Sequence, residues 1–198
     1  MGQPLAICQI RAIVVSMKQA RSILNLVVAA TFTFASNMVQ AQAVDMEALM
    51  QELATGEGWA RAERQILREW GRSGSASVDY LFQRGQAALQ TGEAEAAIEH
   101  FSAVIDHAPD FAEAWNGRAT AYFLANRLGQ ALADIEQVLR LNPRHFGALA
   151  GLGMILEQVD RPEDALRAFD AALAVHPNQE AIQAAAARLR LASAGQAL

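Results

Sequence analysis

The sequence predicts an all-α protein built from stacked helical hairpins, and two observations carry this prediction. Pro109, Pro143 and Pro177 follow one another at a spacing of 34 residues. A fixed period of about 20 to 50 residues is typical of stacked helical repeats. When the three segments are aligned on these prolines, six further columns keep the size and the polarity of their side chains. Such agreement indicates three copies of one structural unit between residues 78 and 179.

The aligned columns combine large, small and aromatic side chains in a fixed order. With the proline numbered 32, positions 4, 8, 11, 20 and 24 of the second segment are Trp115, Ala119, Tyr122, Ala131 and Ile135. This order resembles the pattern of the tetratricopeptide repeat (TPR) family. The first and third segments depart from that pattern at position 11, where Ala88 and Leu156 replace an aromatic residue. The resemblance implies a TPR α-solenoid, which is a fold that binds other proteins.

The chain divides into a leader, a hairpin, three repeats and a cap. The resemblance places TPR 1 at residues 78–111, TPR 2 at 112–145 and TPR 3 at 146–179. Residues 44–77 are in phase with the repeats, but Glu63 stands where the pattern has alanine. We expect this segment to form a degenerate helical hairpin that covers the first repeat. Residues 180–198 are expected to form a capping helix and a tail, because the end of an array must cover an apolar face.

Residues 1–43 have the layout of a secretory signal peptide. Three basic residues precede an apolar run, which ends in the small-x-small triplet Ala41-Gln42-Ala43, and no acidic residue occurs in this segment. The apolar run spans 23–35, which is shorter than the roughly 20 residues of a membrane span. We therefore expect cleavage and a periplasmic or otherwise exported protein. An uncleaved membrane anchor is the alternative, and Met17 is a possible true start.

Composition excludes several classes of function. From residue 44 onward the chain has 13 arginines, no lysine and 21 acidic residues, which gives a net charge of −8. A strongly acidic chain argues against nucleic acid and anionic membrane surfaces as partners. The chain contains neither a zinc-protease motif, nor a glycine-rich phosphate loop, nor a nucleophile elbow. The sequence therefore predicts a non-enzymatic protein without a cofactor or metal.

By the family pattern, the first helix of each repeat lines a groove that binds a client protein or peptide. Carried over, the groove residues are Asp79, Phe82, Gln86, Leu89, Glu113, Asn116, Thr120, Phe123, Met154 and Glu157. The basic clamp of chaperone-binding TPR domains is absent, because the expected clamp positions hold no Lys or Arg. The resemblance thus implies an adaptor or scaffold with an unidentified client. The alternative is a self-associating or structural subunit of a cell-envelope complex, which acts through its convex face and terminal hairpins. A further alternative is that the C-terminal helix folds back and fills the groove.

Overall fold

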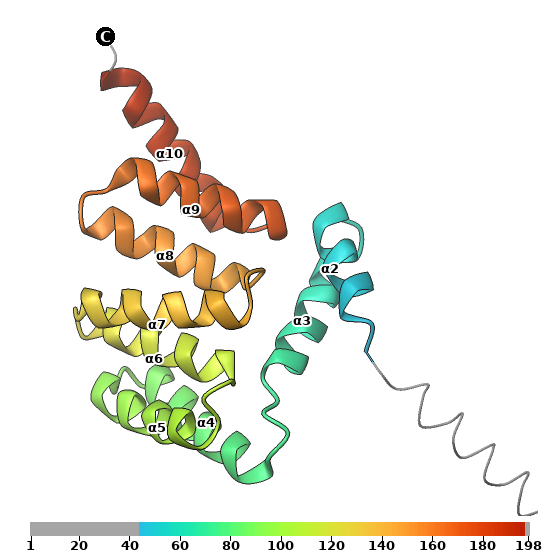
Figure 1. The fold of residues 1–198 in the computed structure, drawn as a ribbon. Helices are drawn as coiled ribbons and strands as arrows, with labels where there is room; N and C mark the ends of the chain where they lie inside the picture. The colour runs from blue at the N-terminus through green and yellow to red at the C-terminus, as the bar shows by residue number, and fades with distance from the viewer. Residues whose placement is uncertain (1–43, 197–198) are drawn as a thin grey trace, which may run out of the picture. The chain divides into compact units, whose positions relative to one another are not determined.

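The computed structural model describes residues 44–196, so the predicted signal peptide lies outside the described residues. Within that range all regular structure is helical, as the sequence predicts (Figure 1). The helices are α2 (Met46–Thr55), α3 (Trp59–Trp70), α4 (Ala76–Gln90), α5 (Ala94–His107), α6 (Ala112–Leu124), α7 (Leu128–Leu141), α8 (Phe146–Gln158), α9 (Pro162–Val175) and α10 (Glu180–Gln196). No helix in this range is long and apolar enough to cross a membrane.

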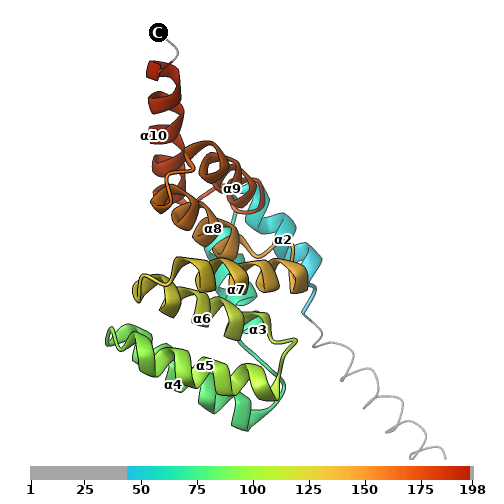
Figure 2. The same ribbon diagram turned by 60° about the vertical axis from the view of Figure 1, so that its left-hand side comes forward.

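Helices α4 to α9 form three antiparallel hairpins that stack in chain order (Figures 1 and 2). Each hairpin corresponds to one predicted repeat, and α10 continues the stack by packing against α9. Ala97, Ala131 and Ala165, which share position 20, are fully buried. A methyl group at this position lets the two helices of a hairpin approach closely, which explains why the column is alanine. The packing therefore follows the periodicity of the sequence.

The turn inside each hairpin repeats with the same 34-residue period. Gly92, Asn126 and Asp160 all adopt positive φ angles, of 77°, 56° and 58°. The residue after each one donates its backbone N–H to a carbonyl five residues earlier, at 2.8 to 2.9 Å. A left-handed residue with this bond is a Schellman motif, which satisfies carbonyls at the end of a helix. Each hairpin turn therefore forms at a residue type that tolerates the left-handed conformation.

The N-terminal hairpin α2–α3 does not cover the first repeat, so that expectation is wrong. Its two tryptophans instead pack on the turns that precede α8 and α10. Trp70 stacks on His145 with ring centroids 4.7 Å apart, and Trp59 lies 5.5 Å from His176. Helix α2 also contacts α9. The hairpin therefore runs along one side of the later repeats (Figure 1).

Glu63 explains this different packing. Its carboxylate lies 3.4 Å from Nε2 of His176, a ring that is 1% exposed. A glutamate at position 20 would prevent the close approach that alanine allows in the other repeats. Docked beside the turn before α10, the same side chain faces an imidazole. Glu63, which departs from the repeat pattern, thus contacts the turn on which the N-terminal hairpin packs.

Candidate functional site

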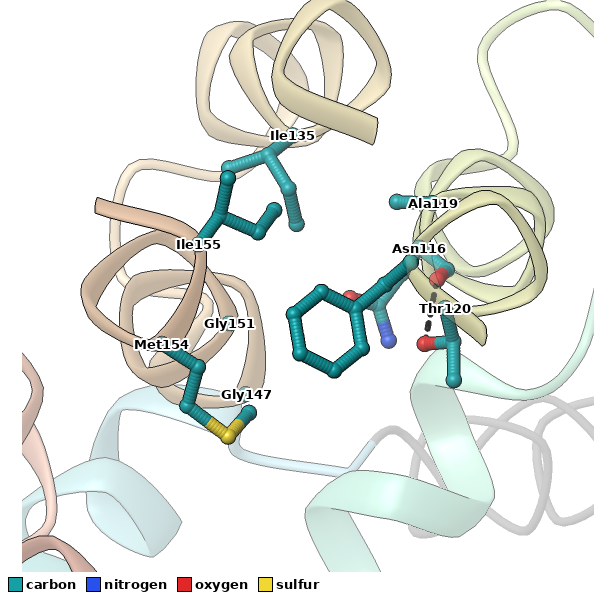
Figure 3. A pocket seen from close by; sticks show the side chains of 9 residues that line it. Asn116, Ala119, Thr120, Ile135, Gly147, Gly151, Met154 and Ile155 are labelled. Atoms are coloured by element: carbon teal, nitrogen blue, oxygen red, sulfur yellow. Dashed lines mark hydrogen bonds between the residues drawn. The ribbon is translucent and has the colours of Figure 1, made fainter. Parts of the chain in front are cut away.

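A small pocket opens between α6 and α8, with one side chain of α7 behind it (Figure 3). Its volume is about 110 Å³. The residues that line it are Asn116, Ala119, Thr120, Phe123, Ile135, Gly147, Gly151, Met154 and Ile155. Most of these side chains are apolar, and none is charged. A pocket of this size and character accepts one uncharged side chain.

The pocket exists because two glycines, one helical turn apart, face it from α8. A Cβ atom on Gly151 would lie 3.5 Å from Cδ1 of Ile135, which is ordinary contact. A Cβ atom on Gly147 would lie 3.4 Å from the His145 ring. Neither position is crowded by the core, so the missing side chains leave usable space. Phe123 of α6 also lines this space.

Two hydrogen bonds join α6 to α8, one near each end of the pocket. Near the N-terminal ends, His145 Nε2 lies 3.0 Å from Oε1 of Glu113. Near the C-terminal ends, Nε2 of Gln158 donates to Oδ1 of Asn126 at 3.2 Å. The imidazole of His145 is 2% exposed, whereas Asn126 and Gln158 are exposed. The pocket therefore lies between one buried and one exposed hydrogen bond.

Polar groups at the pocket come from α6. The hydroxyl of Thr120 donates to the backbone carbonyl of Asn116 at 2.9 Å, so its hydrogen is already used (Figure 3). The side-chain amide of Asn116 provides both a donor and an acceptor at the pocket wall. A backbone segment laid along α6 offers the matching groups. The pocket thus combines an apolar interior with one amide that can hold a peptide group.

The arginine of α6 is held by partners within the fold. Arg118 donates from Nε and Nη2 to both carboxylate oxygens of Asp134, at 2.7 and 2.9 Å, and from Nη1 to Ser102. Its guanidinium also lies 4.9 Å from the centroid of the Trp115 ring. The hydrogen bonds to Asp134 raise the pKa of Arg118 above its ordinary value. This arginine therefore joins three helices and does not present a charge to a ligand.

Four of the predicted groove residues converge on the pocket, and Glu113 lies at its end. The four are Asn116, Thr120, Phe123 and Met154. Met154 is 45% exposed, so its side chain lies on the solvent side of the pocket. Glu157 lies on α8 but forms an ion pair with Arg188 of α10, and this contact lowers the pKa of the Glu157 carboxyl. The second and third repeats therefore hold the candidate site.

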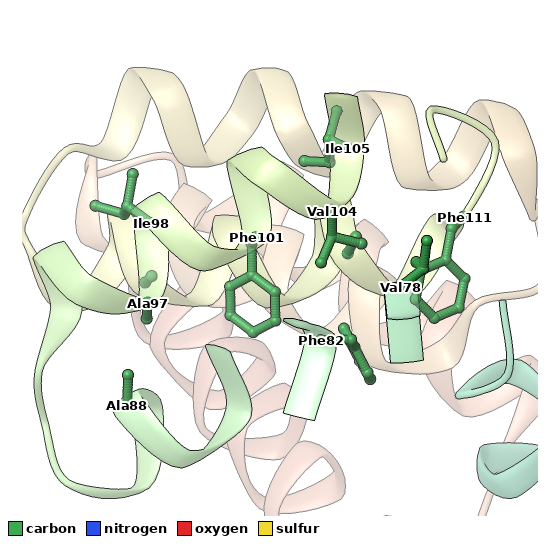
Figure 4. Packing of buried hydrophobic residues seen from close by; sticks show 11 residues of the cluster. Val78, Phe82, Ala88, Ala97, Ile98, Phe101, Val104, Ile105 and Phe111 are labelled. Carbon is green, nitrogen blue, oxygen red and sulfur yellow. The ribbon is translucent and has the colours of Figure 1, made fainter. Parts of the chain in front are cut away.

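The predicted residues of the first repeat do not join this site. Phe82 was expected to be an apolar anchor, but it is 6% exposed and packs against Phe101 and Phe111 (Figure 4). Leu89 is half-buried against the same cluster. Phe82 is therefore a core residue, and its assignment to the groove is wrong. Phe111, from the turn before α6, covers the space into which Phe82 would otherwise open.

The two polar residues of the first repeat have other positions. Asp79 accepts hydrogen bonds from the hydroxyl and the backbone N–H of Ser73, at 2.6 and 2.8 Å, and these bonds lower its pKa. It therefore holds the loop before α4. Gln86 is exposed on α4 and does not line the pocket.

Sequence reasoning did not assign Ala119, Ile135, Gly151 and Ile155 to the site. Ile135 and Ile155 belong to the buried core of the second and third repeats and reach the pocket only from behind. Gly147 and Gly151 stand four residues apart, and therefore on one face of a helix, which was a readable signal. Among the residues that the structure describes, no group of three His, Cys, Asp or Glu side chains is placed to bind a metal.

Comparison with known proteins identifies the family. Profiles of the tetratricopeptide repeat match residues 48–110, 82–134 and 123–189. Together they cover most of the chain, and the chain belongs to the TPR family. The first match begins inside α2, so the profile reads the N-terminal hairpin as part of the repeat array even though it packs elsewhere.

Relatives support the same class of protein. A TPR repeat-containing protein of Rhizobium etli is 36% identical over 119 residues, covering 60% of this chain and 58% of the relative. The Hsp70-Hsp90 organizing protein of Triticum aestivum is 31% identical over 117 residues, covering 59% of this chain and 20% of the wheat protein. This chain thus spans little more than half of the first relative and a fifth of the second.

The fold also recurs in solved structures. The first TPR of Spaghetti (RPAP3), bound to an HSP90 peptide, superimposes with a TM-score of 0.57 at 21% identity. The match covers 59% of this chain and 93% of that domain. At this identity the similarity establishes the fold alone.

Proposed function

We propose that this protein is a non-enzymatic adaptor that captures a client segment along α6 and α8. The observation that carries the proposal is the pocket between these helices, which is apolar, uncharged and opened by Gly147 and Gly151. Pockets that combine an apolar interior with few polar groups are the usual sites of ligand binding. An uncharged side chain of the client enters the pocket, and the amide of Asn116 binds its backbone.

The client we propose differs in chemistry from the acidic peptide of the RPAP3 complex, SRMEEVD. No basic residue lines the pocket, and the nearby Arg118 is occupied by Asp134. The net charge of the chain from residue 44 is −8, so an acidic segment would be repelled. We therefore propose a neutral or basic segment with a bulky apolar side chain.

The test fills the pocket without crowding the core. Gly151→Leu places a side chain where a Cβ atom makes only ordinary contact, so the pocket is occupied while the fold is retained. Gly129→Leu is the matched control, because a Cβ atom there meets nothing within 4 Å and the residue lies on α7. Both changes replace a helical glycine by leucine. Tagged full-length protein of each kind is used to isolate clients from a cell-envelope extract.

Any client that is recovered is then purified and titrated calorimetrically against the three proteins. We expect Gly151→Leu to weaken binding roughly 10- to 100-fold, because burying one aliphatic side chain contributes about 1.5–3 kcal/mol. Gly129→Leu should bind like the unchanged protein. If Gly151→Leu binds equally well, or if each protein recovers only itself, the pocket is not the working surface. A structural, self-associating role would then replace the adaptor.

Export is part of the proposal and rests on the sequence of residues 1–43. The basic start, the apolar run and the Ala41-Gln42-Ala43 triplet support cleavage after Ala43. Peptide mapping of the N-terminus of protein isolated from cell fractions tests this. A mature chain that begins at Val44 in the periplasmic fraction is expected. An intact N-terminus in the membrane fraction would indicate an anchor instead.

A further inference from the structure

Helix α3 bridges two successive turns of the repeat stack. Its first residue, Trp59, packs on His176, and its last residue, Trp70, stacks on His145. A 12-residue helix is about 18 Å long, which matches two successive helix-to-helix spacings of about 8–10 Å and therefore the step from one repeat to the next. The α2–α3 hairpin is therefore attached at both ends of α3 to different parts of the array.

The rings between these two attachment points form a continuous cluster. Phe146 lies 5.3 Å from Trp70 and 5.1 Å from His176, in an edge-to-face arrangement with the latter. Aromatic pairs of this kind stabilise a contact beyond what the area they bury contributes. The cluster makes the attachment rigid, because its rings are packed on several sides.

His145 connects this cluster to the candidate site. Its Nδ1 accepts the backbone N–H of Ala148 at 3.0 Å and so caps α8. Its Nε2 therefore carries the hydrogen and donates to Glu113 at the start of α6. One face of the ring is covered by Trp70. Shielding from water strengthens a hydrogen bond, so Trp70 supports the bond that joins α6 to α8.

We propose that the α2–α3 hairpin is a strap that sets the spacing of α6 and α8 at the pocket, with Trp70 as a positioning residue that acts through His145. None of the residues that line the pocket belongs to the hairpin, so the strap does not block it. Without the strap, water reaches the bond between His145 and Glu113, and the N-terminal ends of the two helices separate. The consequence for client affinity rests on the proposed function, whereas the spacing itself is measured without a client.

The spacing is measured in the full chain by spin labels on cysteines that replace Thr120 and Met154, on opposite sides of the pocket. Both positions are exposed, and the single natural cysteine, Cys8, is replaced by serine. We expect Trp70→Ala to shift the label distances to longer values and to broaden them. Trp70→Phe keeps a stacking ring and should restore most of the original distribution.

Trp59→Ala is the matched control, because it removes the other tryptophan contact of α3 and leaves the pair of Trp70 and His145 in place. It should lower stability to a similar extent while leaving the label distances unchanged. Unchanged distances in Trp70→Ala would overturn the inference. Equal broadening in both variants would overturn it too, because that result shows general loosening and not positioning through His145. Neither result depends on whether the pocket binds a client.

Discussion

Two phenylalanines occupy space that glycines in the facing helices leave open. A Cβ atom on Gly85 would lie 2.7 Å from the ring of Phe101, and one on Gly153 would lie 2.4 Å from the ring of Phe169. Both phenylalanines are fully buried. The middle repeat has alanine and isoleucine at the same two positions. The size of the residue at position 8 therefore varies with the size of the residue at position 24: glycine faces phenylalanine, and alanine faces isoleucine.

Gly153→Ala is expected to lower the stability of the protein. Alanine favours a helix by about 1 kcal/mol over glycine, but the added methyl group collides with a buried ring, which typically costs about 1–3 kcal/mol. Gly151→Ala, two residues earlier in the same helix, makes ordinary contact and should be neutral or stabilising. Urea unfolding followed by circular dichroism measures both. Equal effects of the two changes would contradict the paired packing.

Asp79 makes the stability of the protein depend on pH in the acid range. Hydrogen bonds from Ser73 lower its pKa in the folded state, so the ionised carboxylate stabilises the fold at neutral pH. This stabilisation is present above the unfolded-state pKa, about 3.9, and is lost as the pH falls through the lower folded value. Asp79→Asn should therefore lose less stability than the unchanged protein when the pH is lowered below about 4. Thermal melts over that range give the comparison.

At the scale of the element, each hairpin depends on one residue in the left-handed conformation. Gly92 adopts it without strain, whereas Asn126 and Asp160 carry a Cβ atom in the same conformation. Asn126 gains a compensating contact, because its side chain accepts a hydrogen bond from Gln158. The three turns have equal geometry, but their sequences reach it with different degrees of strain.

Opposite effects are expected at two equivalent turns. Gly92→Ala should destabilise the protein by about 1 kcal/mol, because a side chain disfavours positive φ. Asp160→Gly should stabilise it by a few tenths of a kcal/mol. The relief of backbone strain in the folded state exceeds the entropy that glycine adds to the unfolded chain. Melting temperatures of the two variants test the pair. Destabilisation by both changes would show that Asp160 contributes more than its backbone conformation.

The sequence could predict the parts of the fold that repeat. The prolines and the columns of small and aromatic residues located the three hairpins, because equal packing at each interface requires equal side chains. Phe82, at position 5 of the first repeat, was misplaced because Phe111 from the turn before α6 covers it, a contact that the helix pattern alone does not contain. The docking of α2–α3 was missed because it joins Trp70 and His145, which are 75 residues apart and follow no period.

At the scale of the whole molecule, the array needs a cover at its C-terminal end. Helix α10 packs on α9, and its Ala186 and Leu189 are buried in a cluster with Leu156 and Phe169. An ion pair between Arg188 and Glu157 joins it to α8 as well. Solenoids depend on such terminal caps for solubility, because an unpaired hairpin exposes an apolar face.

Removal of residues 180–198 should therefore cause self-association without abolishing the helical fold of the repeats. The truncated chain exposes Leu156, Phe169 and their neighbours, and a contiguous apolar patch promotes association. Light scattering after size-exclusion chromatography measures the assembly, with Arg188→Ala as a control that removes only the exposed ion pair. A truncated chain that stays in the assembly state of the full chain would show that α10 is dispensable as a cover.

An array of stacked hairpins bends and stretches through small rotations that are shared among all its interfaces. Helix α3 spans the turns before α8 and α10 and so joins the C-terminal part of the array into a stiffer block. The aromatic contacts of the hairpin all fall on that block. The first repeat makes none of these aromatic contacts, so we expect bending to be taken up at the interface between α5 and α6. The array then has a more compliant first repeat and a stiffer C-terminal part.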